Sequence, residues 1–190
     1  VAIAGTRPTT TYRALALGAG NFEVGLVQSA FSVLPALTAV AIGRWIDRHG
    51  EGRTYFGGLL ALSLGGVLSA LAGNLLMLGI AQAIVGFGTI TTLVSGQASI
   101  AARAHPDDWN KRLGTYAASL SLGQLIGPSL AAQIQQLPIV GDAGEQWAFV
   151  VAASLSFAAA LFTLVMPPAP RPQAGGGPES QPGFFAAIAR

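Results

Sequence analysis

Long stretches without a charged side chain constrain this sequence more than any other feature. Asp, Glu, Lys and Arg are all absent from residues 24–43, 54–102, 113–141 and 146–170. A helix needs about 20 apolar residues to cross the hydrocarbon core of a bilayer, which is about 30 Å thick. Only 9% of the 190 residues are charged, against about 25% in an ordinary soluble domain. The sequence therefore predicts an integral membrane protein. Scarce charge excludes disordered and nucleic-acid-coating chains, and zero cysteines exclude a disulfide scaffold.

The uncharged stretches predict five complete transmembrane helices and one incomplete helix. The stretch 54–102 is long enough for two crossings, and Gly73-Asn74 is the natural turn between them, because Gly ends helices and Asn caps them. The expected complete spans are residues 22–42, 54–72, 75–100, 110–135 and 146–166. Residues 1–18 fit the outer part of a first helix whose beginning is missing, and no targeting signal precedes it. The strands of a membrane barrel are not expected, because these stretches do not alternate over about 10 residues.

The last part of the chain differs in composition from the rest. Residues 167–182 hold six prolines and three glycines, which is typical of a linker. An apolar run then begins at Phe184 and stops at Arg190. Both ends read as cut, so we expect a transmembrane bundle over 1–166 and a cytoplasmic linker over 167–190 that leads toward a missing second half. A self-contained protein of half the size is the alternative.

The basic residues lie on one side of the predicted bundle. Eight of the ten Lys and Arg residues fall in the turns after the second and fourth spans or in the tail, and these are Arg44, Arg48, Arg53, Arg103, Lys111, Arg112, Arg171 and Arg190. The turns on the opposite side contain no Lys or Arg. Because cytoplasmic turns of membrane proteins carry an excess of basic residues, we expect a multi-pass protein of the cytoplasmic membrane, with the basic turns and the linker in the cytoplasm.

The turn between the spans 22–42 and 54–72 carries the most specific motif. It reads Gly43-Arg44-Trp45-Ile46-Asp47-Arg48-His49-Gly50-Glu51-Gly52-Arg53. Its Asp can cap a helix or pair with an Arg, and its glycines permit a tight turn. The motif resembles the cytoplasmic loop signature of the major facilitator superfamily. It departs from that signature at Glu51 and matches it at Gly43, Asp47, Arg48, Gly50 and Arg53. The resemblance implies a gating loop that holds two halves of a transporter together, whereas the simpler alternative is that the basic residues only set the topology.

The predicted span 110–135 carries a second motif. Gly123 and Gly127 give a face for close helix packing, and Pro128 removes a backbone hydrogen bond and kinks the helix. The motif resembles the antiporter signature of the same superfamily, which favours an exporter and makes proton antiport one option. Close packing without a transport role is the alternative. Gln82 stands where many proton-coupled exporters of the family have Arg, and the cores of the complete spans hold no Asp or Glu. An importer of a small anionic solute therefore stays open.

Polar residues inside the predicted spans are the candidates for substrate binding. A charge near the bilayer centre costs at least about 2.5–3.5 kcal/mol on insertion scales, so Arg7 is expected to face a cavity or a partner. Pro8 beside it would free carbonyl groups for the same cavity. Arg7 suggests an anionic substrate or a buried carboxylate, unless its side chain reaches the membrane surface. Four uncharged side chains could line the same path or bond a neighbouring helix instead, and these are Gln28, Ser32, Gln82 and Gln124.

The resemblance covers about residues 5–170 and implies an all-α membrane fold. This fold is the six-helix amino-terminal half of a major facilitator transporter, made of two inverted three-helix repeats with the first helix incomplete. The implied function is secondary active transport by alternating access, with a small-molecule substrate, the lipid bilayer and the missing carboxy-terminal half as partners. No nucleic acid, cofactor or metal is expected. An intramembrane protease would need a nucleophile and a base at membrane depth, and Ser95-Gly96 without a His in any span fits this poorly.

Overall fold

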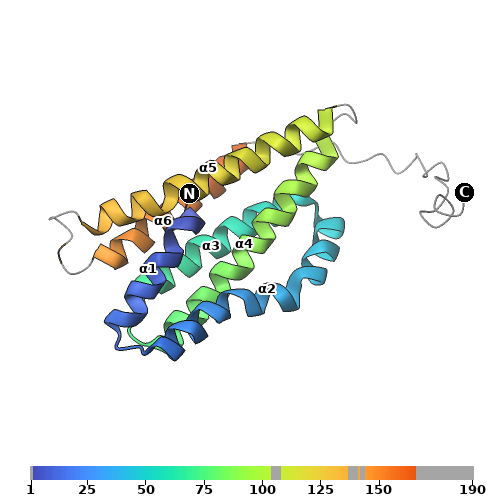
Figure 1. The fold of residues 1–190 in the computed structure, drawn as a ribbon. Helices are drawn as coiled ribbons and strands as arrows, with labels where there is room; N and C mark the ends of the chain where they lie inside the picture. Colours follow the sequence, from blue (N-terminus) through green and yellow to red (C-terminus); the bar gives the residue numbers. More distant parts are fainter. Residues whose placement is uncertain (1, 104–107, 137–140, 142–143, 166–190) are drawn as a thin grey trace, which may run out of the picture.

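The computed structural model describes residues 2–103, 108–136, 141 and 144–165, with side chains from Arg7 onward. Within these ranges the chain forms six helices and no strand (Figure 1). The helices are α1 (Ala2–Ala16), α2 (Asn21–His49), α3 (Glu51–Leu71), α4 (Leu75–Arg103), α5 (Trp109–Gln135) and α6 (Gly144–Val165). The six-helix, all-α fold expected from the sequence is confirmed. The predicted linker over 167–190 lies outside the described residues.

Four of the helices, α2, α3, α4 and α6, are long and apolar enough to cross a membrane. Helix α1 has 15 residues, and its assignment as an incomplete first span stays a prediction. Helix α5 has 27 residues, but its Gln and Ser side chains lower its hydropathy below that of the other four. Five complete spans were expected from the gaps between charges, and length and hydropathy together support four. A crossing by α5 stays a prediction.

The junction between α2 and α3 is shorter than the sequence suggested. Helix α2 continues to His49 and α3 begins at Glu51, so Gly50 alone separates the two helices. Gly50 has a φ of 86°, which a side chain would strain, and its N–H donates to the Ile46 carbonyl at 2.8 Å. The expectation of an extended turn over 43–53 is therefore wrong. Arg48 near the carboxyl end of α2 and Glu51 at the amino end of α3 both favour helix over loop, because each charge opposes the helix dipole.

Side-chain caps fix the turns at the opposite end of the bundle. Asn74 accepts a hydrogen bond from the Met77 N–H at 2.8 Å and so caps the start of α4. Glu23 accepts one from the Gly20 N–H at 2.6 Å at the start of α2. Each bond satisfies a backbone donor that the helix geometry leaves without a partner. The break predicted at Gly73-Asn74 is confirmed.

Glycines bring the central helices close together. An added Cβ at Gly65 on α3 would lie 2.9 Å from the Val85 nitrogen on α4, and one at Gly66 would lie 3.3 Å from the Ala153 Cα on α6. On another face of α4, a Cβ at Gly86 would overlap the Phe31 carbonyl oxygen of α2. Small residues thus replace large side chains as the packing surface, as is common between membrane helices.

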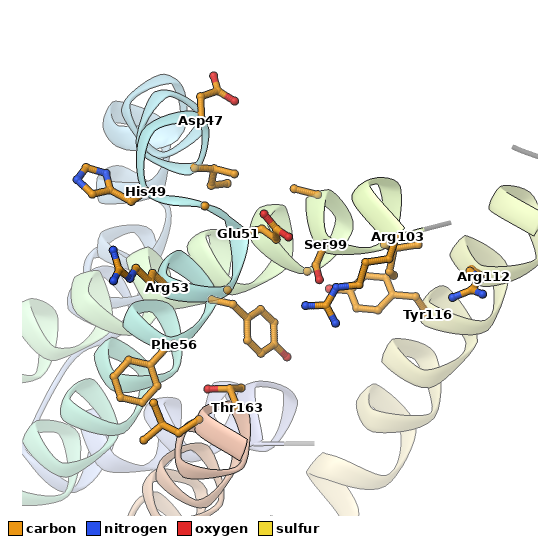
Figure 2. A pocket seen from close by; sticks show the side chains of 18 of the residues that line it. Asp47, His49, Glu51, Arg53, Phe56, Ser99, Arg103, Arg112, Tyr116 and Thr163 are labelled. Carbon is orange, nitrogen blue, oxygen red and sulfur yellow. The ribbon is translucent and has the colours of Figure 1, made fainter. Parts of the chain in front are cut away.

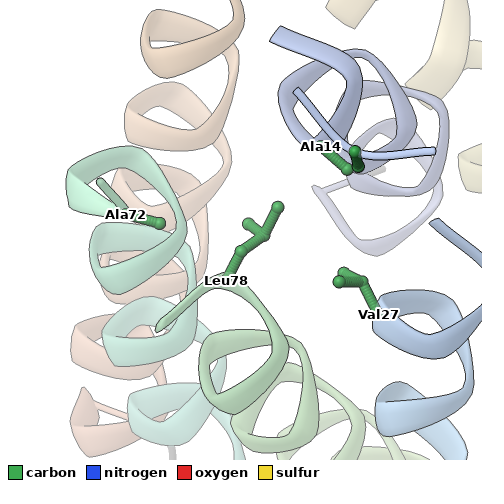
Figure 3. Packing of buried hydrophobic residues seen from close by; sticks show 5 residues of the cluster. Ala14, Val27, Ala72 and Leu78 are labelled. Carbon is green, nitrogen blue, oxygen red and sulfur yellow. The ribbon is translucent and has the colours of Figure 1, made fainter. Parts of the chain in front are cut away.

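One end of the bundle has a small apolar core. Ala14, Val27, Ala72 and Leu78 pack together there, so α1, α2, α4 and the turn after α3 meet at one point (Figure 3). Leu78 is completely buried. This cluster lies at the end opposite the basic turns and packs the helices together at that end of the bundle.

Helices α2 and α5 are the least covered of the longer helices. The buried residues of α2 are Val27 and Ile42, and those of α5 are Gly123, Gly127 and Ala131. Large apolar side chains of both helices are exposed, among them Leu37 at 75% and Leu125 at 73%. α5 packs mainly against α1, with α6 alongside it (Figure 1). Both helices therefore present apolar faces that no described residue covers.

Candidate functional site

Arg7 lies within α1. It is nine residues from the end of α1 at Ala16, which places it about 14 Å along the helix from that end. Its guanidinium carbon lies 4.7 Å from the centre of the Phe31 ring on α2, a cation–π contact. Within the part of the chain that the structure describes, Arg7 has no ion-pair partner. The side chain is exposed, so its charge faces a side of the bundle that these residues leave open.

Gln28 is the candidate that the structure brings directly to Arg7. Its amide donates to the Arg7 carbonyl at 3.3 Å and to the Thr11 hydroxyl at 3.0 Å. Both bonds cross from α2 to α1, so Gln28 holds the backbone that carries Arg7. Ser32 lies one turn further along α2 and is exposed, which places it on the same face as Gln28 and Phe31. Arg7, Gln28 and Ser32 thus form one polar patch across α1 and α2.

Gln82 lies apart from this patch. It is 2% exposed, and its amide donates to the Ser69 hydroxyl on α3 at 3.2 Å. Ser69 in turn donates to the Gly65 carbonyl at 2.8 Å. Gln82 is therefore part of the packing between α3 and α4, not of the exposed face that holds Arg7. The sequence could not separate these two placements, because both fit a polar residue on a transmembrane helix.

The antiporter-like motif lies on the face of α5 that contacts α1. Gly123, Gly127 and Ala131 are buried at intervals of four residues, and the next position in the series, Gln135, donates to the Thr9 hydroxyl of α1 at 3.1 Å. Pro128 follows Gly127 and is half-buried, whereas Gln124 is exposed. The glycines thus belong to a helix contact, and Gln124 faces away from it.

The predicted gating residues lie at the end of the bundle opposite the apolar core. Asp47 and Arg48 are exposed on the last turns of α2, and Arg53 is exposed on the first turn of α3. Gly50 separates the two helices, and an added Cβ at Gly43 would meet only open space. Asp47 has no ion pair with any residue that the structure describes, so a pairing with Arg stays a prediction. These residues border a hollow that the ends of α4, α5 and α6 complete (Figure 2).

Arg13 makes contacts between helices that were not predicted from the sequence. Its Nη2 donates to the Ala72 carbonyl at 2.8 Å, in the turn after α3. The amide of Gln146, with its oxygen turned toward the guanidinium, accepts from Nη1 and Nη2 at 3.2 and 3.0 Å. One side chain thus joins α1 to α3 and α6. The contact with Ala72 spans 59 residues of sequence, and no local pattern marks such a pairing.

Comparison with known proteins identifies the family. The model of the Major Facilitator Superfamily matches residues 2–189. The chain belongs to this superfamily. The family that its two motifs suggested is thereby confirmed, whereas the roles of the motif residues stay predictions. Members of the superfamily are transporters rather than enzymes. Ser95, the one residue that suggested a protease, is fully buried in α4 and donates to the Thr91 carbonyl of its own helix.

Two curated relatives are named multidrug resistance protein B homologues. They come from the CDC 1551 / Oshkosh and ATCC 25618 / H37Rv strains of Mycobacterium tuberculosis, and each is 32% identical to this chain over 143 residues. The match covers 75% of this chain and 26% of each relative. The chain therefore aligns with about a quarter of the length of these relatives.

Proposed function

We propose that this chain is the amino-terminal half of a secondary active exporter. The exporter would move a small molecule, a drug or a metabolite, across the cytoplasmic membrane by alternating access. The observation that carries this proposal is Arg7, a charged side chain in the middle of α1 on a face that no described residue covers; we place it at membrane depth. Such a charge is costly in lipid and is typical of a substrate or ion path. The names of the two relatives support export of drug-like compounds.

The proposed path runs between this half and a second one. Large apolar side chains of α2 and α5 are exposed, and these two helices have the fewest buried residues of the longer helices. We assign them to contact with the carboxy-terminal half, which would place Arg7, Ser32 and Gln124 toward the space between the halves. A carboxylate of the second half could then pair with Arg7 in one conformation and release it in another.

The proposed gate lies at the basic end of the bundle. Arg48 and Arg53 belong to the basic turns, and we place this end in the cytoplasm by the excess of Lys and Arg there. Asp47 is exposed at the end of α2 and free to pair with a group on the second half. In this arrangement Gly50 is the one residue between α2 and α3, so a displacement of the end of α2 would also displace the start of α3.

Import of an anionic solute is the second candidate, and Arg7 is the observation that favours it. A guanidinium with only an aromatic ring beside it is a suitable partner for a carboxylate or phosphate substrate. Arg7 would bind the anion in the same way during export and during import, so the direction of transport is left to the experiment.

Transport in oriented vesicles tests both candidates. Everted vesicles that hold the full-length protein should accumulate a fluorescent drug when energised, and right-side-out vesicles should not. Arg7→Gln should reduce the initial rate at least about tenfold, because a charge-assisted contact is worth about 1.5–3 kcal/mol. Arg44→Gln is the matched control, since Arg44 is exposed at the end of α2. Equal rates for Arg7→Gln and wild type would contradict a role for Arg7, and accumulation of anions in right-side-out vesicles alone would establish import.

A further inference from the structure

A hollow of about 1480 Å³ lies at the basic end of the bundle. Its walls come from the junction of α2 and α3, the last turns of α4, the first turns of α5 and the end of α6. Tyr55 and Tyr116 approach each other there over Gly96, where an added Cβ would lie 2.7 Å from the Tyr116 hydroxyl and 3.4 Å from the Tyr55 ring. The two tyrosines thus bring α5 and α3 together beside Gly96, and the hollow lies between the first turns of α5 and the ends of α3 and α6.

Basic side chains outnumber acidic ones around this hollow. Its charged lining residues are Arg48, Arg53, Arg103, Lys111 and Arg112 on the basic side and Asp47, Glu51 and Asp108 on the acidic side. Arg103 from α4 extends into the hollow, with Arg112 on the α5 side and Glu51 across from it (Figure 2). Neither guanidinium has an ion pair with a described residue. Two positive groups thus face a shared space, and no described carboxylate forms an ion pair with either of them.

An apolar surface continues from the hollow toward the middle of the membrane. Leu164 of α6 lines the hollow, and Leu161 and Phe157 follow it at intervals of three and four residues, which places all three on one helix face. Their exposed fractions are 65%, 50% and 47%. This face runs about 10 Å along α6. The site is therefore cationic at its membrane-surface end and apolar below.

We propose that this hollow binds an anionic phospholipid of the adjoining leaflet. Its phosphate would lie between Arg103 and Arg112, and one acyl chain would lie along the face formed by Leu164, Leu161 and Phe157. Basic pockets between membrane helices bind anionic head groups in this way. Free phosphate would leave the apolar face uncovered, and a neutral lipid would not offset the excess of basic over acidic side chains around the hollow.

The lipid would join parts of the bundle that touch each other little. α5 packs mainly against α1, and its first turns lie across the hollow from α3 and α6. A bound lipid bridges these walls and so resists separation of α5 from the rest. This proposal does not depend on the direction of transport or on the substrate.

Thermal unfolding of the full-length protein in detergent tests the proposal. Dioctanoyl phosphatidylglycerol should raise the midpoint in a saturable way, because a ligand that binds only the folded state stabilises it. Dioctanoyl phosphatidylcholine and inorganic phosphate should each have a much smaller effect. The double variant Arg103→Gln/Arg112→Gln should weaken the apparent affinity for the phosphatidylglycerol at least about tenfold. Arg44→Gln removes the same kind of charge at the same end but lies outside the hollow, and it should leave the affinity unchanged.

A second variant tests the acyl-chain part of the site. Leu161→Ala should weaken phosphatidylglycerol binding a few-fold, because it removes apolar contact area. Leu155→Ala is its control, since both leucines are 50% exposed but lie on different faces of α6. The proposal is overturned if phosphatidylcholine matches phosphatidylglycerol or if phosphate alone gives the full shift. Equal weakening by Arg44→Gln and the double variant would overturn it too, as would equal effects of the two leucine variants.

Discussion

Gly86 lies where the backbones of α2 and α4 meet. An added Cβ would overlap the Phe31 carbonyl oxygen, which belongs to a helix backbone and cannot swing aside. We therefore expect Gly86→Ala to destabilise the protein by about 1–3 kcal/mol, the usual cost of overpacking. Thermal unfolding in detergent measures this. Gly79→Ala on the same helix is the control, because its Cβ would meet nothing within 4 Å. Equal stability of the two variants would show that α2 and α4 do not touch there.

Arg13 holds three helices together through one side chain. Arg13→Gln should lower the free energy of unfolding by about 1.5–3 kcal/mol, because the bonds it loses involve a charged donor. It would also leave the carbonyl of Ala72 without its present partner. Arg13→Lys should recover part of the loss, since it keeps the charge but not the forked geometry.

The same thermal unfolding assay checks the Arg13 variants. Exposed Arg44→Gln should change the free energy of unfolding by no more than about 0.5 kcal/mol. If Arg13→Gln were as mild as this surface change, the contact of Arg13 with Ala72 and Gln146 would carry no stability.

At the scale of the helix, α5 offers the sharpest prediction. Gly127 is buried on the face whose extension, Gln135, bonds to α1. Gly127→Leu should push α5 away from α1 and reduce both thermal stability, by about 1–3 kcal/mol, and export in everted vesicles. Gly114→Leu is the control on the same helix, because its added Cβ would meet only open space. If Gly127→Leu exported as well as Gly114→Leu, the glycine motif would have no part in the transport cycle.

The helices could be predicted from the sequence because the features that form them lie within or beside each helix. Charge-free stretches set the existence of the helices, and Asn74 marks the start of α4 through its own side chain. The end of α2 was misplaced, since hydropathy marks where the membrane ends and not where the helix ends. Arg48, His49 and Glu51 extend the helices into the polar layer through charge and dipole.

At the scale of the whole molecule, the pairing of distant residues could not be predicted from local patterns. Arg7 and Gln28 were both candidates, but only the packing of α1 on α2 brings them together. Gln82, like Gln28, is a glutamine within a predicted transmembrane helix. The packing of α3 on α4 buries Gln82, whereas Gln28 contacts α1. The hollow at the basic end depends on five helices at once, so no single stretch of sequence describes it.

The two ends of the bundle should be accessible from opposite sides of the membrane. The chain contains no cysteine, so Gly52→Cys and Gly73→Cys each introduce one thiol into it. Both positions are exposed, and neither glycine has a neighbour within 4 Å of an added Cβ.

A thiol reagent that does not cross membranes should label Gly73→Cys in intact cells, in a background without other cysteines. It should label Gly52→Cys only in everted vesicles, because the topology proposed from the excess of basic residues has that end in the cytoplasm. Labelling of Gly52→Cys in intact cells would invert the proposed topology and move the gate to the outer face. Labelling of both positions from one side would instead contradict an odd number of crossings between them, and so the assignment of α3 as a complete span.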